Sequence, residues 1–300
     1  MFLFDRSFKL YNFGYYIFGS ILLILFSTLG QIPLLAFLPD EIMPGTDPMD
    51  LLNAIPSNLR IFLILISFVA VLPGIWLVVT KIHNLPVLSI ITSRKKLDFN
   101  RVLFSFCSWG SLLTVLIVIE FILYPENYQL NFKFKEFIIL SLIAILLVPI
   151  QTSVEEIVFR GYLMQGFGNW LNSRLMALIL SSCVFGLLHL ANPELQSLGY
   201  EFIFIYIGVG FVLGIMALMD EGLELSIGFH AANNLIIILL VTADWTVFQT
   251  ESILINISEP EITTSYLISI IIIYPLLLLF FARKYNWSNW KEKLFSRIRN

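Results

Sequence analysis

Three short segments of the sequence carry side chains that could together hydrolyse a bond. The candidate residues are Glu155, Glu156 and Arg160 in VEEIVFRG, Phe185 and His189 in FGLLH, and His230 and Asn234 in HAANN. A carboxylate can act as a general base, an imidazole can assist proton transfer, and imidazole or amide N–H groups can stabilise an oxyanion. The residue types therefore predict a hydrolytic site.

The ionisable members of this set lie in apolar stretches. A charge at the centre of a membrane span costs about 2.5–3.5 kcal/mol, so each one is a candidate functional residue. Glu156 and Arg160 are four residues apart on a helix, with the acid first, which favours an ion pair. Glu155 lies about 100° away around the helix and has Phe159 at the corresponding position. We therefore predict a structural role for the Glu156–Arg160 pair and a chemical role for Glu155.

Helix geometry predicts that the three segments meet. Counted from a short connection at about residues 169–173, Glu155 and His189 both lie about 25 Å along antiparallel helices and so face each other. His230 reaches a compatible depth, and Asn234 is one turn further on the same face. The helix that carries His189 must then end part-way across the membrane. Residues 191–194 would form irregular backbone at membrane depth, which requires protein or a water-filled cavity beside it.

Composition indicates the class of protein that must position these residues. The chain is 58% hydrophobic and 13% charged, against about 25% charged residues in soluble domains. This excludes a disordered chain, and no basic face suggests a nucleic-acid partner. We predict an all-α membrane protein with about eight transmembrane helices. The expected spans are roughly 14–38, 60–81, 101–123, 137–168, 174–190, 200–219, 225–242 and 263–282.

Charge distribution predicts the orientation and the organisation of the chain. Most of the 18 Lys and Arg residues, among them Arg6 and Lys9, fall on one side of these spans, which by the positive-inside rule places both termini in the cytoplasm. We expect one membrane-embedded domain made of helices in 1–136, a catalytic core in 137–242, and a last helix with a basic tail in 243–300. Cys107 and Cys183 have no disulfide or metal spacing and are predicted to be small core residues.

The order and spacing of the motifs resemble a known family. EExxxR, FxxxH and HxxxN follow one another over roughly residues 137–242, as in the CAAX protease and bacteriocin-processing (CPBP) family of intramembrane glutamic endopeptidases, which includes the Ras-converting endopeptidase. The resemblance implies an eight-helix multi-pass protein of the cell membrane whose active site opens to the cytoplasm.

The resemblance also implies roles for individual residues. Glu155 would activate a water molecule, His189 would assist it, and His230 and Asn234 would stabilise the oxyanion. Glu156, Arg160 and Phe185 would support this set. No cofactor is expected, and the expected partners are membrane lipids and a membrane-associated peptide or protein substrate, prenylated or bacteriocin-like, with no nucleic acid.

Two alternatives remain open from the residues alone. Glu155, His189 and His230 could instead bind a divalent metal, since two histidines and a carboxylate form a catalytic zinc site in other enzymes, although HExxH is absent. A non-catalytic scaffold or a transporter could use the same polar cavity. Glu120 and His83 are predicted to be structural.

Overall fold

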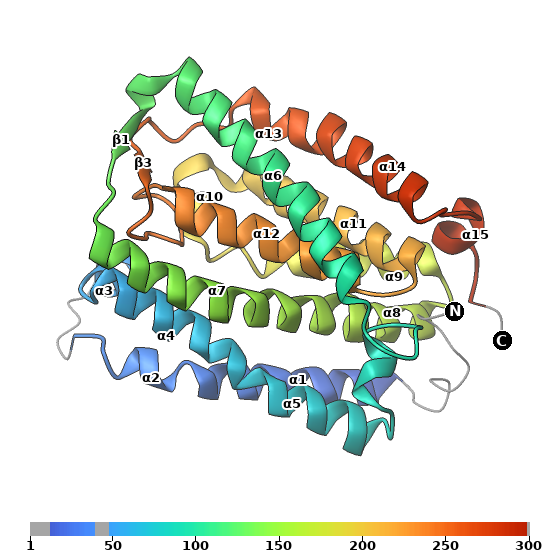
Figure 1. The fold of residues 1–300 in the computed structure, drawn as a ribbon. Helices are drawn as coiled ribbons and strands as arrows, with labels where there is room; N and C mark the ends of the chain where they lie inside the picture. Colours follow the sequence, from blue (N-terminus) through green and yellow to red (C-terminus); the bar gives the residue numbers. More distant parts are fainter. Residues whose placement is uncertain (1–12, 40–47, 299–300) are drawn as a thin grey trace.

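The computed structural model describes residues 13–39 and 48–298 of the chain. The predictions for Arg6 and Lys9, and so for the position of the N-terminus, lie outside the described residues. The model is a bundle of helices with their long axes roughly aligned (Figure 1). The prediction of an all-α membrane protein is confirmed at this level.

The described residues form fifteen α-helices and several shorter helical turns. The α-helices are α1 (Phe13–Gly30), α2 (Ile32–Leu35), α3 (Pro48–Asn53), α4 (Ser57–Val69), α5 (Val71–Leu77), α6 (Phe99–Leu123), α7 (Phe134–Glu156), α8 (Met164–Leu171), α9 (Arg174–Leu187), α10 (Pro193–Leu198), α11 (Ile203–Asp220), α12 (Glu224–Leu240), α13 (Thr264–Ile268), α14 (Tyr274–Lys284) and α15 (Trp290–Phe295). The π-helical segments are η2 (Val78–Ile82), η5 (Ile157–Leu163) and η7 (Ser269–Ile273), and the 3₁₀ turns are η3 (Val87–Ile90), η4 (Pro125–Asn127) and η6 (Tyr200–Phe202).

Within the described residues, six continuous helices are long and apolar enough to cross a membrane. They are Phe13–Leu35, Ser57–Ile82, Phe99–Leu123, Phe134–Leu171, Tyr200–Asp220 and Ser265–Lys284. The other two predicted spans correspond to the shorter apolar helices Arg174–Leu187 and Glu224–Leu240. The count of eight spans and the cytoplasmic termini therefore stay predictions.

The longest helix presents the first motif well inside the bundle. Phe134–Leu171 runs for 38 residues through α7, η5 and α8, which at 1.5 Å per residue is about 57 Å. It therefore extends beyond a hydrocarbon core of about 30 Å. Asn172 ends it in the left-handed conformation, and the Ser173 hydroxyl then accepts a hydrogen bond from the Met176 N–H to begin α9. This tight hairpin is the connection that the sequence predicts.

The helix that carries the second motif ends early, as expected. α9 stops at Leu187, and residues 188–192 form turns before α10 begins at Pro193. Irregular backbone therefore covers 188–192, whereas the expectation for Pro193 and Glu194 is wrong because they start a short helix. Proline suits this first helical position because its missing N–H would have no partner there.

A small sheet at one end of the bundle was not predicted. The strands β1 (Tyr128–Leu130), β3 (Leu254–Asn256) and β2 (Val241–Thr242) lie in that order, with β1 antiparallel and β2 parallel to β3. The predicted span 225–242 accordingly ends at Leu240. Strands of two or three residues are too short to show an alternating pattern in the sequence.

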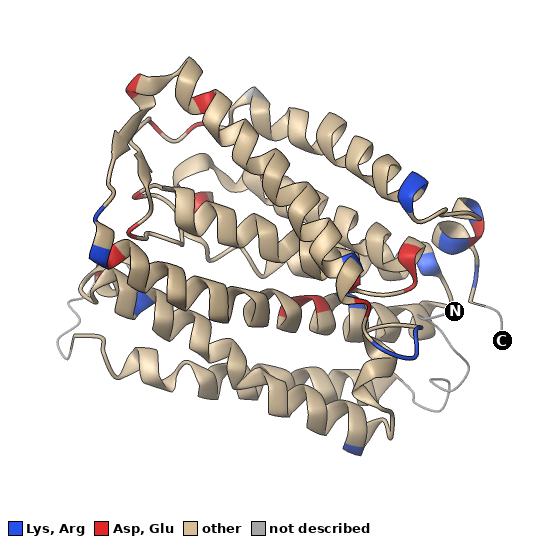
Figure 2. Ribbon diagram, in the orientation of Figure 1, with Lys and Arg blue, Asp and Glu red and all other residues tan. Residues whose placement is uncertain are grey.

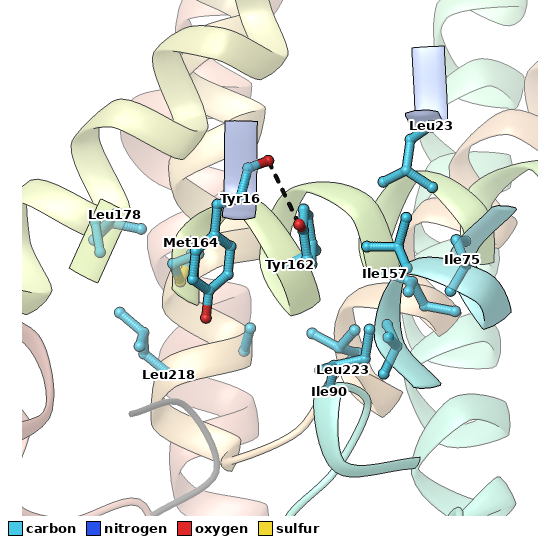
Figure 3. Close-up of a cluster of buried hydrophobic side chains, with 14 of the residues drawn as sticks. Tyr16, Leu23, Ile75, Ile90, Ile157, Tyr162, Met164, Leu178, Leu218 and Leu223 are labelled. Carbon is cyan, nitrogen blue, oxygen red and sulfur yellow. Dashed lines mark hydrogen bonds between the residues drawn. The ribbon is translucent and has the colours of Figure 1, made fainter. Parts of the chain in front are cut away.

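Helices from both halves of the chain enclose the first motif. α12 packs against α6 and α7, and α9 packs against α11 (Figure 1). A buried cluster joins Tyr16 and Ile75 of the N-terminal helices to Ile157 and Tyr162 of η5 (Figure 3). Gly161 lets η3 pack closely against η5, because a Cβ there would lie 2.5 Å from the carbonyl oxygen of Ile90.

The two cysteines do not both belong to the core. Cys107 is exposed on α6 and Cys183 is partly buried on α9, and neither forms a disulfide. The prediction is therefore wrong for Cys107. Apolar residues on the outside of a membrane bundle face lipid, so an apolar sequence context does not indicate burial within the protein.

Candidate active site

The first motif lies at the junction of α7 and η5, deep inside the bundle. Glu156 and Arg160 are fully buried, and Arg160 Nη1 donates to Glu156 Oε1 at 2.9 Å. In Figure 2 the acidic pair is the red segment within α7, whereas most other charged residues gather toward the ends of the bundle. The predicted ion pair is confirmed. A π-helical segment directly after two glutamates agrees with the frequent occurrence of such bulges at functional sites.

Arg160 connects this motif to two further helices. Its Nη2 donates to the carbonyl oxygen of Gly210 on α11 at 3.3 Å, and its guanidinium carbon lies 4.3 Å from the ring centre of Phe185 on α9. Gly210 lets α11 approach α9 closely, because a Cβ there would lie 3.1 Å from Ser182. Phe185 is 2% exposed, so it shields the buried charge from solvent.

His230 on α12 contacts both glutamates. Its Nδ1 lies 2.9 Å from Glu156 Oε1, and its Nε2 lies 3.5 Å from Glu155 Oε2. An ionised carboxylate only accepts hydrogen bonds, so Nδ1 is the donor to Glu156. Nε2 therefore faces Glu155, the glutamate that the sequence assigns to the chemistry.

His189 lies in the turn after α9, beside the same group. Its Nδ1 lies 2.7 Å from the carbonyl oxygen of Phe185, which only accepts, so Nδ1 carries the proton. In the neutral ring, Nε2 is then left as a proton acceptor. The His189 ring stacks on Tyr206 of α11 with ring centres 4.3 Å apart. This stacking partner was not identified from the sequence.

The predicted site residues do converge. Phe185 lies edge-on to His230, with ring centres 6.1 Å apart, and is 4.7 Å from the ring centre of His189. His189 is close enough to Glu155 and His230 for the charges of these two side chains to act on its ring. Among the hydrogen bonds of the described chain, none joins Glu155 directly to His189.

Asn234 enters the site through a residue that sequence reasoning missed. Gln151 is 4% exposed on α7; its Nε2 donates to Glu155 Oε1 at 2.7 Å, and its Oε1 accepts from Asn234 Nδ2 at 3.1 Å. A buried glutamine four residues before Glu155 was available as a sequence signal, because positions four apart share a helix face.

Other polar residues lie outside this group. His83 Nε2 contacts the hydroxyl of Tyr162 at 3.0 Å, and burial lowers the pKa of His83 to about 4. Glu194 Oε1 accepts from the N–H of Val247 at 2.9 Å, and burial raises the pKa of this carboxyl. Both residues make structural contacts away from the three motifs.

The possible metal ligands were tested against their geometry. Over residues 13–39 and 48–298, no group of three or more His, Cys, Asp or Glu side chains is arranged to hold a metal ion. Glu155, His189 and His230 therefore do not form a metal-binding group in the described residues, and the metal alternative is not favoured.

Comparison with known proteins agrees with this arrangement. The family model for the Rce1-like type II CAAX prenyl endopeptidases matches residues 134–236, which include all three motifs. The Bacillus subtilis (strain 168) protein YyaK, described as uncharacterized, is 32% identical over 241 residues, covering 78% of this chain and 79% of that protein. The chain belongs to the Rce1-like family. No solved structure matches it.

Membership of the Rce1-like family identifies the general class of activity. The protein is a hydrolase of the CAAX protease type, and its apolar helices make it a multi-pass membrane protein. The match begins at the start of α7 and ends within α12, so the family-matched segment supplies Glu155, His189, His230 and Asn234.

Proposed function

We propose that this protein is an intramembrane endopeptidase in which Glu155 activates water for hydrolysis of a peptide bond. The observation that carries the proposal is the convergence of three motifs around Glu155. His230 Nε2 lies 3.5 Å from its Oε2, and Gln151 joins its Oε1 to Asn234. A general base, proton carriers and oxyanion donors within one buried site are the parts that peptide hydrolysis requires.

Each side chain has a separate step in this mechanism. Glu155 removes a proton from a water molecule, whose oxygen attacks the carbonyl carbon of the scissile bond. The resulting oxyanion accepts hydrogen bonds from the Asn234 amide and from the His230 ring. When the carbon–nitrogen bond breaks, the proton taken from water passes to the leaving amine, with His189 Nε2 assisting the transfer.

The buried ion pair keeps these groups in place. Glu156 Oε1 accepts from both Arg160 Nη1 and His230 Nδ1 at 2.9 Å. The hydrogen bond from His230 Nδ1 to Glu156 fixes the orientation of the His230 ring, as carboxylates do for histidines in other sites. Glu156 thus supports the chemistry without entering it.

The proposed substrate is a membrane-associated peptide or protein. The protein lies in the cell membrane with its site open to the cytoplasm, because the basic residues flank the helix ends nearest the first motif. A prenylated C-terminus and a bacteriocin-like peptide are both included in this class. Because apolar helices embedded in lipid surround the site, either substrate would reach it while remaining associated with the membrane.

Two competing functions are less well supported. The metal-dependent version lacks a suitable ligand arrangement among the described residues. A scaffold or transporter would not need Glu155 to lie beside His230 and to be linked through Gln151 to Asn234. The family match also concerns an endopeptidase.

Cleavage of defined peptides tests the proposal. Purified protein in detergent is incubated with farnesylated, geranylgeranylated and unmodified C-terminal peptides and with leader-type peptides, and the products are read by mass spectrometry. We expect wild type to cut at least one peptide at a single bond, Glu155→Gln to cut none, and a chelator to have no effect. Equal cutting by folded Glu155→Gln would contradict the role of Glu155, and loss of cutting with the chelator would favour the metal version.

A further inference from the structure

A line of side-chain hydrogen bonds runs from α6 to Glu155. Trp109 Nε1 donates to Asn233 Oδ1 at 3.2 Å, and Asn233 Nδ2 donates to Asn234 Oδ1 at 3.3 Å. Asn234 Nδ2 donates to Gln151 Oε1 at 3.1 Å, and Gln151 Nε2 donates to Glu155 Oε1 at 2.7 Å. Three consecutive amides therefore link an indole to the carboxylate of the site.

The chemistry of the two ends sets the direction of the whole line. An indole N–H can only donate, and an ionised carboxylate can only accept. Reversing any amide would place two donors or two acceptors against each other at both of its contacts. Amide oxygen and nitrogen positions are normally assigned from such networks, and here both ends require the same assignment.

We propose that Trp109, Asn233 and Gln151 are positioning residues that fix the orientation of the Asn234 amide and of the Glu155 carboxylate. This inference rests on the proposed function and names residues that are not among the predicted site residues. Because Asn234 Oδ1 is held by Asn233, its Nδ2 is held on the side of Gln151 and Glu155, where its second N–H can meet an oxyanion. Trp109 lies on α6, so the line also gives the chain before residue 134 a part in the site.

Burial makes the line suitable for this task. Trp109 is 2% exposed and Gln151 is 4% exposed, while Asn233 and Asn234 are partly buried. Trp109 is also held by stacking on Phe229, with ring centres 4.7 Å apart. Hydrogen bonds in a low-dielectric interior are stronger than in water and polarise one another along a chain.

Two isosteric variants break the line at different points. Gln151→Met keeps the length of the side chain and removes both of its hydrogen bonds. Asn233→Asp keeps the acceptor for Trp109 and places a carboxylate oxygen against Asn234 Oδ1, which favours a reversed Asn234 amide. Thr152→Val is the matched control, because Thr152 is fully buried next to Gln151 and its hydroxyl bonds only to the backbone of its own helix.

The first measurement does not depend on peptide cleavage. A hydrophobic carbodiimide couples to protonated carboxyl groups, and mass spectrometry reads its attachment to Glu155 as a function of pH. We expect the half-labelling pH to rise by about one unit in Gln151→Met, the effect of losing one hydrogen bond to a charged group. Thr152→Val should match wild type. An unchanged profile in folded Gln151→Met would overturn the proposal.

The second measurement uses whichever peptide wild type cleaves. We expect Gln151→Met and Asn233→Asp to lower kcat at least about tenfold with KM changed less than about threefold, because the lost contacts orient groups that act in the transition state. The acid side of the kcat/KM profile should move upward in Gln151→Met. Unaltered kcat in both folded variants would overturn the proposal.

The two measurements separate this inference from the proposed function. If wild type cleaves none of the peptides while the labelling profile of Gln151→Met moves, the positioning line stands and the proposed protease mechanism fails. If wild type cleaves and Glu155→Gln does not, but neither profile responds to Gln151→Met, the mechanism stands and the positioning line fails. Trp109→Phe supplies a third break in the line should Gln151→Met not fold.

Discussion

Two buried charged clusters in this molecule differ in whether every carboxylate oxygen has a hydrogen-bond donor. One is the polar cap, formed by Arg94, Arg101, Asp220 and Glu224 where α11 meets α12. The other is the cluster that we propose to be catalytic, called the catalytic cluster below and formed by Glu155, Glu156, Arg160 and His230. Both contain two carboxylates with side chains that are largely inaccessible to solvent.

In the polar cap every carboxylate oxygen has a donor. Arg94 binds Asp220 at 3.0 Å and Glu224 at 3.1 Å, and Arg101 binds the other oxygen of Asp220. The remaining oxygen of Glu224 accepts from the N–H of Asp98 at 3.4 Å. Arg101 also pairs with Asp98 at 3.2 Å, so each carboxylate of this network has a guanidinium partner, as expected for a structural network.

The catalytic cluster is not balanced in this way. Arg160 is its one guanidinium, and it binds Glu156 together with His230 through a single carboxylate oxygen. The other oxygen of Glu156 is buried and has no hydrogen-bond partner among the described residues, and Glu155 meets His230 only at 3.5 Å. Incomplete matching leaves groups able to bind a proton or a substrate, whereas complete matching only fastens elements together.

Removing Arg160, the guanidinium of the catalytic cluster, should give the largest loss of stability. Arg160→Ala leaves buried carboxylates without their guanidinium and should lower the free energy of unfolding by about 3–5 kcal/mol. Arg160→Lys keeps the charge but loses the two-sided contact to Glu156 and Gly210 and should fall between Ala and wild type. Chemical denaturation in detergent measures the loss. A cost below about 1 kcal/mol for Arg160→Ala would contradict the role of the pair.

Loss of one oxyanion donor should act on the rate more than on the stability. Asn234→Ala is expected to lower kcat by about 10²–10³-fold on a cleaved peptide. Its unfolding temperature should fall by less than that of Arg160→Ala, since Asn234 is only partly buried and its loss unpairs the Gln151 amide oxygen but no charge. A rate within threefold of wild type would remove Asn234 from the mechanism.

Removing an arginine of the polar cap should lower stability without slowing cleavage. Arg94→Ala removes donors from Asp220 and Glu224 and should cost about 1–3 kcal/mol of stability. Cleavage at a temperature where the variant is folded should match wild type. Denaturation and a cleavage assay on one preparation measure both effects, and a rate loss like that of Asn234→Ala would make the two clusters equivalent.

The smallest effect concerns His83, which lies in neither cluster. Burial lowers the pKa of His83 to about 4 in the folded protein, against about 6.5 in an unfolded chain. Below pH 6.5 the unfolded chain binds a proton that the folded protein does not, so stability falls as the pH drops from 6.5 toward 4. The loss should be about 2 kcal/mol between pH 7 and pH 5 and should be absent in His83→Gln. Unfolding temperatures at pH 7 and pH 5 compare the two proteins, and equal slopes would contradict the assignment.

The geometry of this cluster was largely predictable because its signals are local, whereas its catalytic role stays a proposal. The spacing of Glu156 and Arg160 gives their pairing, and counting residues from the hairpin gives the convergence of Glu155 with His189. Such arguments succeed in a membrane protein because helix rise and span length are nearly fixed.

The parts that the sequence does not predict depend on rotations between helices. Whether Gln151 meets Asn234 is decided by how α12 turns its face toward α7, and no pattern within either helix specifies that. The three short strands depend on loops meeting at the end of the bundle. Cys107 faces outward because lipid and protein interior select the same apolar residues.

The central claim is that the unmatched cluster performs the chemistry and the matched one does not. The most direct test makes the same substitution in each: Glu155→Gln and Glu224→Gln, both purified in detergent, with cleavage rates measured on one peptide that wild type cuts. We predict that Glu155→Gln loses at least about 10³-fold in rate while remaining folded, and that Glu224→Gln stays within about threefold of wild type. Equal rates for the two variants, or a larger loss in Glu224→Gln at equal folding, would contradict the account.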